Sequence, residues 1–138
     1  MKNKKEKLED FKAAISSTVK SLSNSRKTEV NFGDQVSSKD KNCIKLPNLE
    51  YVKDKINFEE VRAIADSKSL KLRFSDKKIL RKFEPKGMVS KKLYQISENI
   101  RCEKIGTSYF KGVKKNIQNY YQIRLSGLDL KNNEDKVV

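Results

Sequence analysis

Apolar side chains recur every three or four residues along most of this chain, and that spacing constrains its fold more than any other feature. It places the apolar residues of a segment on one face of an α-helix. The pattern predicts helices over residues 5–23, 57–74, 88–105 and 108–124, with a short helix ending near Phe83. Uninterrupted apolar runs never exceed three residues, so we expect no segment to span a membrane.

Residues at the predicted helix ends agree with these boundaries. Asn57 is a cap-type residue, with Glu60 at the capping-box position. Asp76 is expected to cap a new helix after a break at Ser75. Gly106 is expected to be the residue just beyond the end of the helix over 88–105.

Two short segments alternate polar and apolar residues and are therefore read as strands, residues 28–32 and 44–47. They are able to pair as a ribbon, which is marginal unless it packs on helices. We therefore expect a mainly α fold over residues 1–127, with four to five helices and a minor two-stranded β ribbon, and a disordered tail over residues 128–138. The predicted common core contains Val61, Ile64, Leu93, Ile96, Ile100 and Phe110.

The formal net charge of +14 invites a nucleic-acid-binding interpretation, because basic surfaces bind phosphate by counterion release. However, 26 of the 32 basic residues are Lys and only six are Arg, the residue that makes bidentate phosphate and base contacts. A basic nucleic-acid-binding module is therefore kept only as the alternative function.

Residue types that serve most catalytic sites are missing from the sequence. It has no histidine, which removes the usual general base and the commonest metal ligand. It also has no GxxxxGK[ST] or GxGxxG loop for phosphate. Cys43 and Cys102 lie far apart and form no CxxC motif, which suits a reducing cytoplasm. We therefore expect no catalytic, cofactor-binding or metal-binding residue, and a cytoplasmic location.

The remaining candidates are charged residues at helical spacing. As internal ion pairs they stabilise helices only slightly, whereas the scarce Arg residues suit carboxylates on a partner. Both interpretations stay open for the three pairs, which are Arg62 with Asp66, Arg73 with Asp76, and Glu98 with Arg101.

Short sequence words occur in a characteristic order along the chain: Phe11-x-x-Ala14, Glu29-Val30-Asn31-Phe32-Gly33, Leu46-Pro47, Arg62-x-x-x-Asp66-Ser67, Arg73-x-x-Asp76, Pro85-x-Gly87, Glu98-x-x-Arg101-Cys102-Glu103-x-Ile105-Gly106 and Gly112-Val113-x-x-Asn116. This succession, over about residues 9–120, resembles the N-terminal region of the CobT-type subunit of the aerobic, ATP-dependent cobaltochelatase.

The resemblance implies a noncatalytic part of an enzyme that inserts cobalt(II) into hydrogenobyrinic acid a,c-diamide in cobalamin biosynthesis. It implies two partners, an AAA+ ATPase subunit and a large corrin-binding subunit, and leaves self-association open. The complex uses ATP, Mg and cobalt(II), and none of them is expected to bind to this chain.

The sequence also departs from the family pattern. Family chains continue through an acidic linker into a C-terminal von Willebrand A domain, and this sequence ends at Val138 before both, so we expect a fragment, a truncated product or a split subunit. Two positions where relatives usually carry histidine are Ser75 and a place near Leu80 here. A histidine-based cobalt site is therefore not expected.

Overall fold

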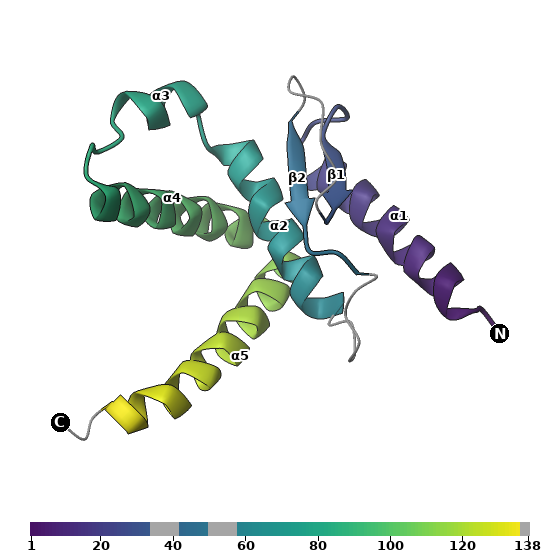
Figure 1. The fold of residues 1–138 in the computed structure, drawn as a ribbon. Coiled ribbons are helices and arrows are strands. Elements are labelled where there is room, and N and C mark those ends of the chain that lie inside the picture. The colour runs from purple at the N-terminus through teal and green to yellow at the C-terminus, as the bar shows by residue number, and fades with distance from the viewer. Residues whose placement is uncertain (34–41, 50–57, 136–138) are drawn as a thin grey trace.

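Five helices and one pair of strands make up the part of the chain that the computed structural model describes, residues 1–33, 42–49 and 58–135. In chain order the elements are α1 (Lys4–Leu22), β1 (Glu29–Phe32), β2 (Cys43–Leu46), α2 (Phe58–Phe74), α3 (Lys77–Lys82), α4 (Met88–Tyr109) and α5 (Lys111–Asp135) (Figure 1). The predicted fold class, mainly α with a minor two-stranded sheet, is confirmed. The predicted cap at Asn57 lies outside the described residues.

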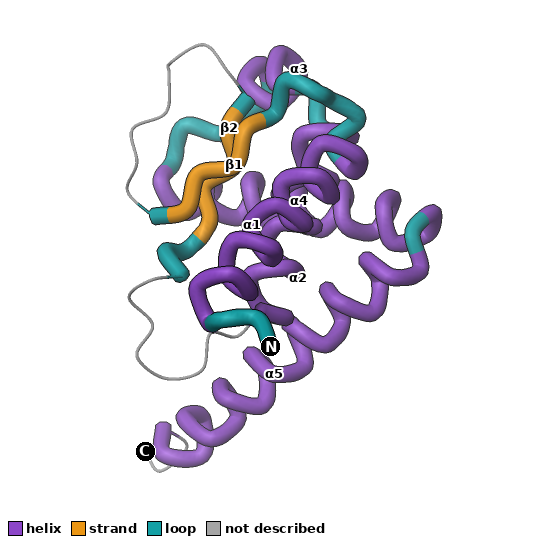
Figure 2. Tube along the Cα trace, turned by 90° about the vertical axis from the view of Figure 1, so that its right-hand side faces the viewer, coloured by secondary structure: helices purple, strands orange, loops and turns teal. Residues whose placement is uncertain are grey.

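The first of two cores lies between α1, the strands and the N-terminal part of α2. Ile15 and Val19 of α1 are buried together with Ile44 of β2 and Val61 of α2. The strands pair in parallel, with Val30 opposite Ile44. They lie beside these helices (Figure 2). Because two strands alone are marginal, packing against α1 and α2 is what stabilises the ribbon. The predicted first helix and ribbon are confirmed.

The second core joins the C-terminal half of α2 to α1 and α5. Leu70 of α2 is fully buried, and it clusters with Leu22 of α1 and with Val113 and Ile117 of α5. The helix α2 therefore lies at the centre of the molecule. It has α1 and the strands on one side and α4 and α5 on the other (Figure 1).

The helix α4 packs against α2 through small and polar residues and not through its apolar residues. Cys102 and Gly106 are buried in this contact. Leu93, Ile96 and Ile100 are 60%, 52% and 55% exposed. The prediction that these three residues belong to the common core is therefore wrong.

A close approach of the two helices explains which face of α4 turns inward. A Cβ atom on Gly106 would lie within 3 Å of the Leu70 side chain, so α4 comes this near to α2 only with glycine at that position. The Lys71 ammonium of α2 also donates to Gln95 Oε1 of α4 at 3.2 Å. Gly106 thus lies inside α4, which continues to Tyr109, and its predicted role as the residue after the helix is wrong.

The last helix is longer than the sequence predicted. Instead of ending near residue 124, α5 continues through Gly127 to Asp135, so the backbone is helical over most of the segment expected to be a disordered tail. Glycine inside a helix costs about 1 kcal/mol, which weakens a helix without ending it. Gly127 does not have the positive φ that would turn the chain away.

Candidate functional site

Arg101 and Glu98 form a two-point ion pair that also holds α4 against the end of α2. Arg101 Nε and Nη2 donate to the two carboxylate oxygens of Glu98 at 2.8 and 2.7 Å. The same Nη2 donates to the main-chain carbonyl of Phe74 at 2.8 Å, which satisfies an acceptor at the end of α2. The hydrogen bond from Arg101 lowers the pKa of Glu98 to about 2. The pair predicted from the sequence is therefore formed, and it works inside the chain.

The other predicted pair near this end, Arg73 with Asp76, does not form. Asp76 caps α3, and its carboxylate accepts from the backbone N–H groups of Lys78 at 2.8 Å and Ile79 at 3.2 Å. Arg73 instead donates to the carbonyl of Leu22 at 3.3 Å and lies over two aromatic rings, those of Phe74 and Phe110. Both residues hold neighbouring elements in place, and the capping role predicted for Asp76 is confirmed.

Asp66 is buried between α2 and α5. Only 1% of the residue is exposed, and its carboxylate accepts a hydrogen bond of 2.9 Å from the side-chain amide of Asn116. Burial raises the pKa of Asp66, although the bond from Asn116 and the charge of Arg62 act in the opposite direction. Arg62 itself is exposed, and within the described residues it donates no hydrogen bond. Of the six predicted contact residues, Arg62 therefore presents the charge that is least engaged within the chain.

Glu103 is a further buried acid of α4. It accepts hydrogen bonds from the hydroxyl of Ser67 on α2 and from the hydroxyl of Tyr121 on α5, the latter at 2.9 and 3.0 Å. Burial, followed by this bond to Glu103, raises the pKa of Tyr121 to about 12. One carboxylate thus joins three helices.

These contacts show that short sequence motifs far apart in the chain lie next to one another in the fold. Asp66 and Ser67 of one word bond to Asn116 and Glu103 of two others, and Gly106 lies against Leu70. Residues of these motifs therefore help to fix α2, α4 and α5 to one another. From the sequence, only ion pairs within one helix are predicted, and Asn116 has no predicted contact.

A surface pocket of about 580 Å³ opens beside this junction. Three positive groups from two helices line it, Arg62 of α2 and Lys111 and Lys115 of α5. The buried Asp66 also lines the pocket, and the rest of its wall includes Tyr109, Phe110 and Thr18. Three cations around one pocket suit a carboxylate or phosphate group of a ligand or partner. Lys111 and Lys115 were not predicted as site residues, because nothing in the sequence distinguishes them from the other lysines among the 26.

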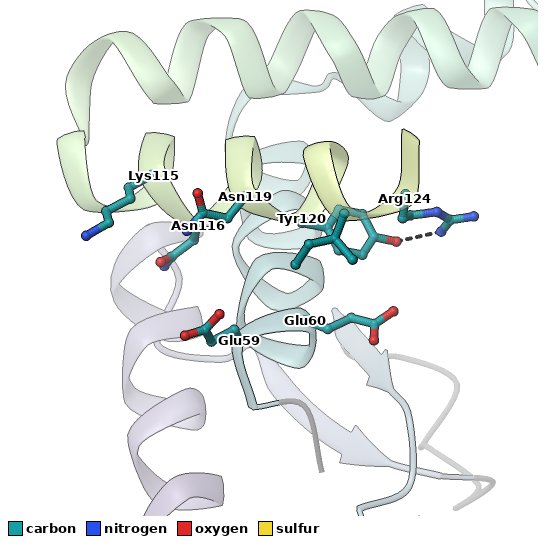
Figure 3. A pocket seen from close by; sticks show the side chains of 8 residues that line it. Glu59, Glu60, Lys115, Asn116, Asn119, Tyr120 and Arg124 are labelled. Carbon is teal, nitrogen blue, oxygen red and sulfur yellow. Dashed lines mark hydrogen bonds between the residues drawn. The ribbon is translucent and has the colours of Figure 1, made fainter. Parts of the chain in front are cut away.

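A smaller pocket of about 240 Å³ lies nearby, between the start of α2 and the middle of α5. Figure 3 shows Glu59 and Glu60 on the α2 side, facing Asn119 and Tyr120 on the α5 side. Arg124 Nη1 donates to the Tyr120 hydroxyl at 2.6 Å, and this bond raises the pKa of Arg124. The pocket therefore has carboxylates on one wall and hydrogen-bond donors on the other. From the sequence, Glu60 is predicted only as a residue of the helix start.

Over residues 1–33, 42–49 and 58–135, no three Asp, Glu, Cys or His residues gather as a metal-binding group. Cys102 is fully buried, and burial raises the pKa of its thiol. None of the helices described is long and apolar enough to cross a membrane.

No solved structure matches the chain. The family model described as cobalamin biosynthesis protein CobT matches residues 5–136, nearly the whole chain, and it includes every sequence word that meets at the α2, α4 and α5 junction. The chain belongs to the family of the cobalamin biosynthesis protein CobT.

Proposed function

We propose that this chain is a noncatalytic part of a cobaltochelatase subunit. In this role it supports the ATP-dependent insertion of cobalt(II) into hydrogenobyrinic acid a,c-diamide, in the cytoplasm. The observation that carries the proposal is the family match over residues 5–136, since that family is one of cobalamin biosynthesis.

The way the charged residues are used supports a noncatalytic role. Asp66, Asp76, Glu98 and Arg101 all bond to groups of this chain, and these bonds cap or join helices. Charged residues that hold helices together in this way support a role as a rigid part of an assembly. Arg62 remains exposed for a contact with another protein.

The proposed partners are the AAA+ ATPase subunit and the large corrin-binding subunit of the chelatase. Self-association is a third possibility within the same role. The pocket lined by Arg62, Lys111 and Lys115 offers cations to carboxylates on such a partner.

Reconstitution tests the proposal. The full chain is added to the purified AAA+ and corrin-binding subunits with Mg-ATP and cobalt(II), and cobalt insertion is followed by the absorbance of the corrin. We expect the chain to be captured by at least one subunit and to increase the rate of insertion. An unchanged rate together with no capture would reject the proposal.

The net charge of +14 favours one competing function, a basic nucleic-acid-binding module. Titration of DNA and RNA duplexes at several salt concentrations distinguishes the two. Tight binding that falls steeply with salt would favour the competing function, because each neutralised phosphate adds to the salt dependence. The proposed chelatase role predicts only weak binding of this kind.

A further inference from the structure

The largest exposed apolar feature on α4 is one continuous face of the helix. Val89, Leu93, Ile96 and Ile100 follow one another at spacings of four, three and four residues, and they are 71%, 60%, 52% and 55% exposed. We call these four residues the α4 apolar stripe. This spacing is that of a helix face that packs along another helix. Exposed apolar patches of this kind mark interaction sites on proteins.

The stripe ends where α5 meets α4. Glu103, three residues after Ile100, continues the same face and is bonded to Tyr121 of α5. From this junction the two helices diverge (Figure 1). Leu125 and Leu128 follow Tyr121 on α5 by four and seven residues and are also exposed, at 59% and 53%. A helix placed along the stripe would therefore have a second apolar face close to one of its ends.

The exposed charges beside the stripe on α4 are positive. The exposed positions that flank it include Lys92 and Lys104, together with Ser90 and Ser97, whereas the carboxylate on this face, Glu103, is buried and accepts hydrogen bonds from Tyr121. Residues 77–92, which lead into the stripe, contain seven Lys or Arg residues and one acid. Such a surface complements a helix with carboxylates on both sides of an apolar face.

We propose that the α4 apolar stripe is the docking site for an acidic amphipathic helix of another protein. A second copy of this chain fits less well, because pairing two stripes would bring Lys92 and Lys104 of the two copies together. Nucleic acid fits less well too, because phosphates would leave the four apolar side chains uncovered. The inference deepens the proposed function by naming the chemistry of a partner, and it rests on that function only in assuming that the chain acts within an assembly.

A designed peptide tests the docking site without any chelatase subunit. The probe is a fluorescent helix of about 20 residues with Leu at the stripe-facing positions and Glu at the flanking ones, and its binding to the full chain is followed by anisotropy. The double variant Leu93→Gln/Ile100→Gln should weaken binding by about tenfold or more. Ile79→Gln, which changes an equally exposed residue of α3 (57%), should leave binding unchanged. Because all three side chains are exposed, we expect each variant to keep the melting temperature of the parent.

The following results would overturn the proposal. One is that a peptide with Lys in place of every Glu binds the parent chain as tightly as the acidic peptide does, since charge would then not select the occupant. Another is equal binding of the acidic peptide to parent and double variant. A dimer of the parent that the double variant abolishes would assign the stripe to a second copy. A DNA duplex that the double variant binds more weakly would assign it to nucleic acid.

This test and the reconstitution fail independently. If the peptide binds as expected but the chain neither joins the chelatase subunits nor speeds insertion, the docking site stands and the chelatase role falls. If insertion depends on the chain but is equally fast with the double variant, and the peptide does not bind, the docking site falls and the chelatase role stands.

Discussion

Gly106 of α4 lies so close to Leu70 of α2 that a Cβ atom at the glycine would fall 2.3 Å from Leu70 Cδ2. Leu70 is fully buried, and side chains in a close-packed interior move aside only at a cost in free energy. Gly106→Ala should therefore lower the free energy of unfolding by about 1–3 kcal/mol, despite the better helix propensity of alanine. Urea denaturation measures this change.

The matched control for this substitution is Gly127→Ala in α5. No atom lies within 4 Å of the new Cβ there, so the free energy of unfolding should stay the same or rise by up to about 1 kcal/mol. If Gly106→Ala behaved like the control, the close contact between α2 and α4 would be refuted.

The ion pair between Glu98 and Arg101 should give stability that depends on pH. Folding lowers the pKa of Glu98 from 4.5 to about 2, so its stabilisation is complete above pH 4.5 and is lost as the pH falls through 2. Glu98→Gln should lower the free energy of unfolding by about 1 kcal/mol at neutral pH, since Arg101 is half exposed to solvent. The difference from the parent should shrink as the pH falls from 4.5 towards 2.

An exposed ion pair serves as the control for Glu98. Lys2 and Asp10 pair at 2.6 Å with both side chains more than half exposed. Asp10→Asn should leave the stability nearly unchanged at every pH. Denaturation curves of both variants between pH 2 and pH 7 provide the comparison, and a pH-independent effect of Glu98→Gln would contradict the assigned role.

Asp66 should behave in the opposite way to Glu98. Burial raises its pKa above the ordinary 3.8, so folding favours the protonated form, and stability decreases as the pH rises through the raised value. Asp66→Asn removes the buried charge and should raise the free energy of unfolding at pH 7 by about 1 kcal/mol. The gain should vanish in acid. Asp76→Asn, an exposed cap where both residues serve equally well, should show neither effect.

Arg62 is the residue whose substitution should affect a partner without affecting the fold. Its side chain is exposed and donates no hydrogen bond to another described residue. Arg62→Gln should reduce capture of the proposed chelatase partners by about tenfold and leave the melting temperature nearly unchanged. Arg101→Gln, in contrast, should lower the melting temperature, because it removes the contact with Phe74. A fall in melting temperature for Arg62→Gln with normal capture would assign it a structural role.

Helical spacing in the sequence located the helices well because it depends only on the period of the apolar residues. It could not say which face of a helix turns inward. In α1 the apolar face is buried at Ile15 and Val19. In α4 the apolar face is exposed at Leu93 and Ile96, because hydrogen bonds and Gly106 bind the opposite face to α2.

Only some contacts of the candidate site were predicted, because helical spacing describes one helix at a time. Spacing rules detect neighbours on one helix, so they found the pair of Glu98 and Arg101. They could not detect that Asp66 bonds to Asn116, a residue fifty positions away. Such contacts depend on how α2 and α5 cross. The sequence indicates this crossing only indirectly, through the order of its short motifs.

The central position of α2 also affects how the molecule unfolds. This helix contacts α1 and β2 from the first part of the chain and α4 and α5 from the last part. If either part of the chain opens alone, the other part stays packed on α2. The amide hydrogens of α2 should therefore exchange with solvent only when the whole molecule unfolds. The end of α5, where Leu128 is exposed, should exchange within a much shorter time. A single helix should therefore make the two parts of the chain unfold as one cooperative unit.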